Sequence, residues 1–196
     1  MKTHVILIHG IRKVDSLECM QRLRPFFIAR KKNPIIHDYG HLGILTRFQN
    51  KRLAKELADK INSLDGRVIV VAHSNGCAIT HLAASLYNAK INKAVYINAA
   101  LESRVDVPSS IESVDVYHAP SDFTLLLGAL RPFHIWGTMG RYGYRGKSTN
   151  VTNYNFEMDF VVKNKGHSTL FERDIIEYYG PIIVNNTLQD KVKNHD

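Results

Sequence analysis

The stretch around Ser74 constrains the fold of this chain more than any other part of its sequence. The residues from Val68 to Ala72 are apolar and mostly β-branched, which is typical of a strand buried in a parallel sheet. The residues from Asn75 to Leu86 follow almost at once and have the pattern of a helix. A strand that passes directly into a helix needs a sharp turn, so the positions two before and two after its apex must be small. Ala72 and Gly76 meet this need, and we predict a strand, a tight turn and a helix with Ser74 at the apex.

Strands and helices are expected to alternate along the rest of the chain. The expected strands are Thr3–Ile8, Pro34–Tyr39, Val68–Ala72, Lys93–Ala99, Ser113–Ala119 and Met158–Lys163. The expected helices are Asp15–Pro25, Arg47–Ile61, Asn75–Leu86 and Thr169–Tyr179, the first ended by Pro25 and the last by Gly180-Pro181. This alternation predicts an α/β fold with a mostly parallel central sheet and helices on both faces.

Length and composition favour one compact domain. A chain of 196 residues fits a single core, and we expect residues 1–196 to form one domain. The apolar share of 44% and the charged share of 22% are near globular averages, which argues against a disordered chain. No apolar run reaches the roughly 18 residues of a transmembrane helix, and the N-terminus does not resemble a signal peptide. Cys19 and Cys77 match neither a disulfide framework nor a zinc pattern, so we expect a cytoplasmic setting.

The net charge of +8 allows two interpretations. Lysines and arginines cluster at residues 30–32 and between Arg47 and Lys55, and such clusters usually form a solvated face. The alternative is attraction to an anionic substrate, a membrane surface or nucleic acid. We favour the solvated face and consider nucleic acid an unlikely partner.

The segment Ala72-His73-Ser74-Asn75-Gly76, together with His9-Gly10 after the first expected strand, resembles the α/β-hydrolase superfamily, in particular its small lipase and esterase branch of minimal bacterial or phage type. The resemblance spans nearly the whole chain. It departs from the G-x-S-x-G form at Ala72, as the elbows of many lipases do. It implies a minimal α/β-hydrolase fold that lacks the usual first two strands.

The resemblance also implies a catalytic triad in the chain order serine, acid, histidine. Ser74 is then the nucleophile. Asp122 follows the strand Ser113–Ala119, and His167 follows the last expected strand, where this fold places its acid and its base. His167 would accept the serine proton, and Asp122 would orient the imidazole and balance its charge.

Each of these assignments has an alternative. A serine in a glycine-flanked turn can merely cap a helix, and Asp122 can form an Asx turn or a cap. His134 is the second candidate for the base, and Asp115 and Asp106 are less well placed candidates for the acid. We expect His73 to be a packing residue of the turn rather than a second base.

The resemblance further implies an oxyanion hole formed by the backbone N–H groups of Ile11 and Asn75. Between the acid and the base lies a glycine- and aromatic-rich insert at about residues 124–155, with a glycine at every third position from Gly137 to Gly146. Long loops in compact domains are often functional, so the insert is interpreted as a lid or pocket wall in which Trp136 and Tyr142 bind substrate. The alternative is a loop that buries its aromatic residues in a small core of its own.

These features predict hydrolysis of a carboxylic ester through an acyl-enzyme on Ser74. The expected partner is a small-molecule acyl substrate, no metal or organic cofactor is implied, and the sequence carries no signal for an oligomeric state. A thioesterase, an amidase or an acyltransferase could use the same triad. A binding module with a basic face is the alternative from a different class.

Overall fold

A parallel sheet forms the centre of the molecule. The computed structural model describes residues 1–196 except 12, 41–45, 126–136, 158–165 and 190–196. Its elements are β1 (Thr3–Ile8), α1 (Lys13–Ala29), β2 (Ile35–His37), α2 (Thr46–Asn62), β3 (Arg67–His73), α3 (Asn75–Tyr87), β4 (Lys93–Ile97), β5 (Val114–His118), α5 (Met139–Tyr142), β6 (Val151–Asn155), a 3₁₀ turn at Thr169–Phe171 and α6 (Arg173–Leu188). The described strands lie in the order β2-β1-β3-β4-β5-β6, and each neighbouring pair is parallel.

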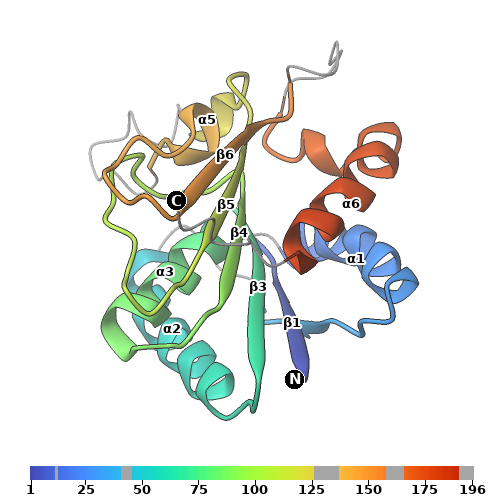
Figure 1. The fold of residues 1–196 in the computed structure, drawn as a ribbon. Helices are drawn as coiled ribbons and strands as arrows, with labels where there is room; N and C mark the ends of the chain where they lie inside the picture. Colours follow the sequence, from blue (N-terminus) through green and yellow to red (C-terminus); the bar gives the residue numbers. More distant parts are fainter. Residues whose placement is uncertain (12, 41–45, 126–136, 158–165, 190–196) are drawn as a thin grey trace, which may run out of the picture.

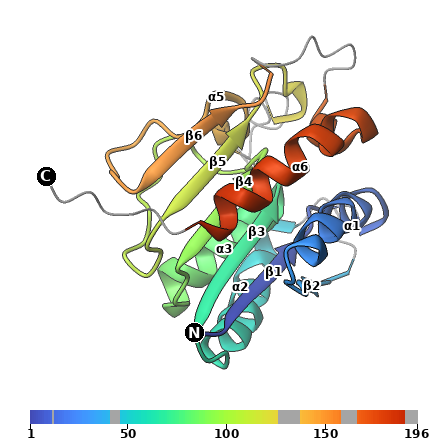
Figure 2. The same ribbon diagram turned by 45° about the vertical axis from the view of Figure 1, so that its right-hand side comes forward.

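Helices cover both faces of this sheet (Figures 1 and 2). Successive side chains of a strand point to opposite faces, and β1 shows this clearly. Val5 and Leu7 belong to the core beneath α1 and α6, whereas Ile6 and Ile8 belong to the core beneath α2 and α3. Both faces of β1 are therefore buried, which explains its continuous apolar run and confirms the predicted α/β architecture.

The strand order reverses between β1 and β3. From β1 the chain moves outward to β2, then returns to β3 and continues to β6 in the other direction. Ligands in open α/β sheets bind at the carboxyl ends of the strands where the order reverses. Gly10 follows β1 and Ser74 follows β3 at this point, so the fold brings the two sequence motifs together.

Two predicted helix ends are wrong. Helix α1 continues through Pro25 to Ala29, and α6 continues through Gly180 and Pro181 to Leu188. A proline inside a helix removes one hydrogen bond, but these continuations bury apolar side chains such as Phe27 and Ile183. Gly180 serves close packing rather than termination, because a Cβ atom there would lie 2.5 Å from the ring of Phe26 on α1.

The predicted insert contains more regular structure than expected. It includes α5 and the edge strand β6, which pairs with β5 from Val114↔Val151 to His118↔Asn155. The glycines allow backbone to pack on backbone: a Cβ atom at Gly140 would lie 2.3 Å from the carbonyl carbon of Asn98. The strand predicted at Met158–Lys163 lies outside the described residues.

Candidate active site

Ser74 occupies a strained, tightly held turn between β3 and α3. Its φ of 55° and ψ of −121° are unfavourable for a residue with a side chain. The turn is held by hydrogen bonds from the Ser74 N–H to the Ile97 carbonyl (3.0 Å) and from the Ala100 N–H to the Ser74 carbonyl (3.2 Å). A Cβ atom at Gly76 would lie 2.6 Å from the His9 carbonyl oxygen. The requirement for a small residue at this position therefore has a direct steric cause.

Ser74, His167 and Asp122 form one hydrogen-bonded chain. His167 Nε2 lies 2.6 Å from Ser74 Oγ, and His167 Nδ1 lies 2.7 Å from Asp122 Oδ2. With a proton on Nδ1, the imidazole donates to the carboxylate and accepts from the serine hydroxyl. The Ser74 side chain makes no capping hydrogen bond to α3, so the alternative of a helix cap does not account for it. Ser74 is also buried, with only 7% of its surface exposed.

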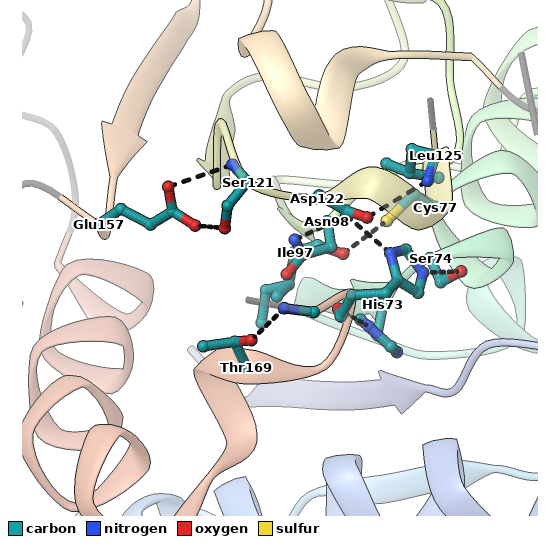
Figure 3. Close-up of polar contacts among 12 residues, drawn as sticks. His73, Ser74, Cys77, Ile97, Asn98, Ser121, Asp122, Leu125, Glu157 and Thr169 are labelled. Carbon is teal, nitrogen blue, oxygen red and sulfur yellow. Dashed lines mark hydrogen bonds and ion pairs between the residues drawn. The ribbon is translucent and has the colours of Figure 1, made fainter. Parts of the chain in front are cut away.

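Asp122 is fully buried and bonded at both oxygens. Its Oδ2 accepts from Asn98 Nδ2 (3.0 Å) as well as from His167, and its Oδ1 accepts from the Leu125 N–H (3.3 Å) (Figure 3). One oxygen therefore caps the following turn, as the alternative interpretation held, while the other faces the imidazole. Together these bonds fix the orientation of the carboxylate.

Neighbouring contacts hold the loops that carry Asp122 and His167. The N–H and the hydroxyl of Ser121 both donate to the carboxylate of Glu157, which follows β6 (Figure 3). On the other side, the Gly166 N–H donates to Thr169 Oγ1 at 2.7 Å. The residues before Asp122 and His167 are thus each tied to a fixed element.

The structure separates the other candidates from Ser74 or does not describe them. Asp115 forms a buried ion pair with Lys93 (2.8 Å) within the sheet, and Asp106 is exposed in the loop after β4. Both lie apart from the chain of hydrogen bonds around Ser74. His134 lies outside the described residues.

His73 packs against the ring of His167 as a neutral ring. Its ring centroid lies 5.0 Å from that of His167 and 5.1 Å from that of Phe171, and His73 Nε2 lies 3.3 Å from the His167 carbonyl oxygen. Burial, reinforced by the neighbouring His167, lowers the pKa of His73 to about 3. A ring with this pKa stays uncharged, in agreement with a packing role.

Replacing His73 with phenylalanine should change how stability depends on pH. The pKa of His73 is about 3 in the folded protein, against 6.5 in an unfolded chain, so its contribution to stability is present above pH 6.5 and is lost as the pH falls. Between about pH 6 and about pH 4, wild-type unfolding should take up about one proton more than His73→Phe unfolding. Denaturant titrations at several pH values measure this difference, with His4→Phe, near the amino end of β1, as the control. Equal slopes for wild type and His73→Phe would contradict the prediction.

The two predicted oxyanion donors lie on either side of Ser74. Asn75 is the first residue of α3, where backbone N–H groups have no partner within the helix. Ile11 follows Gly10, and a Cβ atom at Gly10 would lie 3.0 Å from Ser74 Cβ and 3.4 Å from Ser74 Oγ. The loop after β1 therefore lies directly against the serine.

The predicted substrate wall is described only in part. Tyr142 is 38% exposed on α5, with the guanidinium carbons of Arg141 and Arg145 at 5.3 Å and 4.8 Å from its ring centroid. It is thus an exposed aromatic side chain between two cations rather than part of a core. Trp136 lies outside the described residues.

Sequence reasoning missed several residues that support the site. These are Tyr39, Asn50, Asn98 and Glu157. Tyr39 and Asn98 each come directly or shortly after a strand, at the edge of the sheet where ligands bind, and this position was the available signal.

Comparisons with known proteins agree with this architecture. The sequence model of the family described as serine hydrolase matches residues 45–122, less than half of the chain; the matched part includes Ser74 and Asp122. The curated proteins include no match to the sequence.

Among solved structures, the alpha/beta hydrolase domain-containing protein 10 from mouse superposes with a TM-score of 0.60 at 12% identity, over 95% of this chain and 89% of that one. Est1E from Butyrivibrio proteoclasticus, solved with ferulic acid, gives 0.57 at 12% identity over 95% and 90%. A predicted CIB-like hydrolase from Thermoplasma acidophilum gives 0.56 at 13% identity over 93% and 85%.

The chain therefore has the α/β-hydrolase fold. Together with the serine hydrolase match, this fold supports a hydrolase. None of the helices in the described ranges is long and apolar enough to cross a membrane, and the same residues contain no cluster of three potential metal ligands.

Proposed function

We propose that this protein hydrolyses carboxylic esters through an acyl-enzyme on Ser74, with His167 as the base and Asp122 as its orienting acid. The observation that carries the proposal is the pair of short contacts at the two ring nitrogens of His167, 2.6 Å to Ser74 Oγ and 2.7 Å to Asp122 Oδ2. This is the arrangement that a serine nucleophile requires.

The proposed reaction has two halves. His167 Nε2 removes the proton of Ser74 Oγ as the oxygen attacks the ester carbonyl, and the imidazolium then protonates the departing alcohol. Water repeats these steps on the acyl-enzyme and releases the acid. In each half the negative charge on the former carbonyl oxygen would be stabilised by the N–H groups of Ile11 and Asn75.

A panel of chromogenic acyl esters of increasing chain length, run beside a fluorophosphonate label, tests this proposal. We expect hydrolysis of at least one ester and one label per chain, placed on Ser74 by peptide mapping. Thioester, anilide and acyl-acceptor substrates in the same panel distinguish a thioesterase, an amidase or an acyltransferase. Salt-dependent retention on DNA with no labelling would instead support a binding module with a basic face.

We further propose that Trp136 and Tyr142 form part of the substrate wall. Tyr142→Ala should then change the ratio of kcat/KM between long and short acyl chains by roughly ten-fold to two-hundred-fold, because one methylene in an apolar pocket is worth about 1–3 kcal/mol. Trp136→Ala should shift the same profile. Since Tyr142 is 38% exposed, its loss should leave the melting temperature nearly unchanged.

The alternative gives a different outcome. An aromatic residue packed in a core of the insert would leave a cavity when truncated, destabilise the protein by about 3–5 kcal/mol and reduce activity on all esters together. A melting curve and a chain-length profile for each variant separate the two. A large loss of stability with an unaltered profile would refute the substrate wall.

A further inference from the structure

We infer that Tyr39 is a positioning residue for the oxyanion hole: through its hydroxyl group it holds the peptide that carries the Ile11 N–H, one of the two backbone donors proposed for that hole. This inference deepens the proposed function and rests on it. Tyr39 follows β2 and is separated in sequence from both donors, so its role arises only in the folded chain.

The Tyr39 hydroxyl fixes the orientation of the Gly10–Ile11 peptide. The Tyr39 hydroxyl lies 2.7 Å from the Gly10 carbonyl oxygen and 2.5 Å from the His9 carbonyl oxygen, so two acceptors share its hydrogen. The Gly10 carbonyl belongs to the same planar peptide as the Ile11 N–H, and the two groups point in opposite directions in a trans peptide. Holding the carbonyl toward Tyr39 therefore turns the Ile11 N–H away from Tyr39.

A second donor, His9, also holds the Gly10 carbonyl in this orientation. His9 Nδ1 also lies 2.7 Å from the Gly10 carbonyl oxygen, so both lone pairs of that oxygen are used. The His9 ring is buried and stacks on the Tyr39 ring, with centroids 4.1 Å apart and planes inclined by 22°. Rotation of the Gly10–Ile11 peptide would break both hydrogen bonds at a buried carbonyl, which is costly.

The other donor is held separately. The side-chain amide of Asn75 exchanges two hydrogen bonds of 3.0 Å each with the amide of Asn50 on α2. Asn75 is only 2% exposed, so its side chain is held in place and its backbone N–H is held with it. Tyr39 therefore acts on the Ile11 side of the oxyanion hole.

The hydroxyl keeps its proton at ordinary pH. Burial raises the pKa of Tyr39 well above its usual value, so the group remains a neutral donor. A neutral hydroxyl that donates to the Gly10 carbonyl can fix the direction of the Ile11 N–H, and this direction matters most when negative charge develops on the substrate oxygen.

Tyr39→Phe tests this inference, because it keeps the ring and its stacking on His9 but removes the hydroxyl. We expect kcat to fall by about ten-fold to a hundred-fold, since a misplacement of about 1 Å in an active site can cost a hundred-fold. KM for the ester should stay unchanged. The affinity for a phenylboronic acid, which forms an anionic tetrahedral adduct with the serine, should fall by the same factor as kcat.

Two further variants make the result specific. Tyr179→Phe is the matched control, because the Tyr179 hydroxyl donates to a backbone carbonyl, that of Phe156, at 3.0 Å within the core. It should lose similar stability and keep wild-type kcat and boronate affinity. His9→Phe keeps an aromatic ring against Tyr39 but removes the second donor to the Gly10 carbonyl, and it should lower kcat and boronate affinity without changing KM, even if Tyr39→Phe proves too unstable to assay.

The outcomes separate this inference from the proposed function. Failure of wild-type protein to react with fluorophosphonate at Ser74 would overturn the proposed function and this inference with it. If wild type is labelled and hydrolyses esters, while Tyr39→Phe and His9→Phe match its kcat and boronate affinity, then the positioning role alone is overturned. A parallel loss in Tyr179→Phe would also overturn it, because the effect would then reflect general destabilisation.

Discussion

Replacing Ser74 with alanine is expected to lower kcat for ester hydrolysis by about a million-fold, the usual consequence of removing the nucleophile of a serine triad. The fluorophosphonate label should be lost with it. Stability should change by no more than about 1 kcal/mol, because the substitution removes one hydrogen bond to His167 and leaves the backbone conformation as it was. Substantial residual ester hydrolysis in pure Ser74→Ala protein would show that another residue performs the reaction.

Ser74→Gly is the companion variant, because it separates chemistry from strain. It should be as inactive as Ser74→Ala. Glycine adopts a φ of 55° without steric cost, which releases about 1–3 kcal/mol of strain, and its greater freedom in the unfolded chain offsets about 0.4–1 kcal/mol of that gain. The glycine variant should therefore melt at a higher temperature than the alanine variant. This result is expected if the strained backbone is retained because it positions the side chain of a nucleophile.

The buried part of the sheet was predictable from the sequence because burial on both faces requires apolar residues at successive positions. In β1 and β3 each face of the strand packs against a helical layer, so residues 5–8 and 68–72 are apolar without interruption. The sharp turn at Ser74 was predictable for a similar reason, since the steric demand of the turn selects the small residues Ala72 and Gly76.

The edge strand β6 and the true ends of α1 and α6 were not predictable in this way. The sequence of β6 is Val-Thr-Asn-Tyr-Asn, and its side chains are at most half-buried, so burial imposes no apolar pattern. Pro25 and Pro181 favour helix termination locally. Distant packing partners, such as Phe26 against Gly180, outweigh this preference, and they are invisible in a local stretch of sequence.

The residues of the candidate site also differ in whether the sequence predicts them. Ser74, Asp122 and His167 follow from a motif and a chain order, and the structure brings them within hydrogen-bond distance; their catalytic roles stay a prediction. Tyr39 and Asn98 have no motif. Each contributes one polar atom to a network between elements far apart in sequence, and such networks follow only from the packed structure.

Asp122→Asn is expected to lower kcat by about ten-thousand-fold while KM for the ester changes little, the usual consequence of this substitution in a serine triad. Asparagine fits the same space, but it removes the negative charge that stabilises the imidazolium. In the wild type, the carboxylate accepts hydrogen bonds from both His167 Nδ1 and Asn98 Nδ2. The side-chain amide of the asparagine can instead direct its own N–H group toward one of these two nitrogen donors. The imidazole then favours the tautomer with its proton on Nε2, which cannot accept the proton of Ser74.

The control for this variant is Asp106→Asn, at the exposed aspartate that the sequence offered as another acid; it should keep wild-type kcat. Because Asp122 also caps the turn at Leu125, some loss of stability is expected in Asp122→Asn and does not bear on its role in catalysis. The decisive measurement is kcat of the folded variant, checked by its melting curve. Wild-type turnover in folded Asp122→Asn would remove this aspartate from the proposed mechanism, and turnover lost in Asp106→Asn instead would assign the acid to that residue.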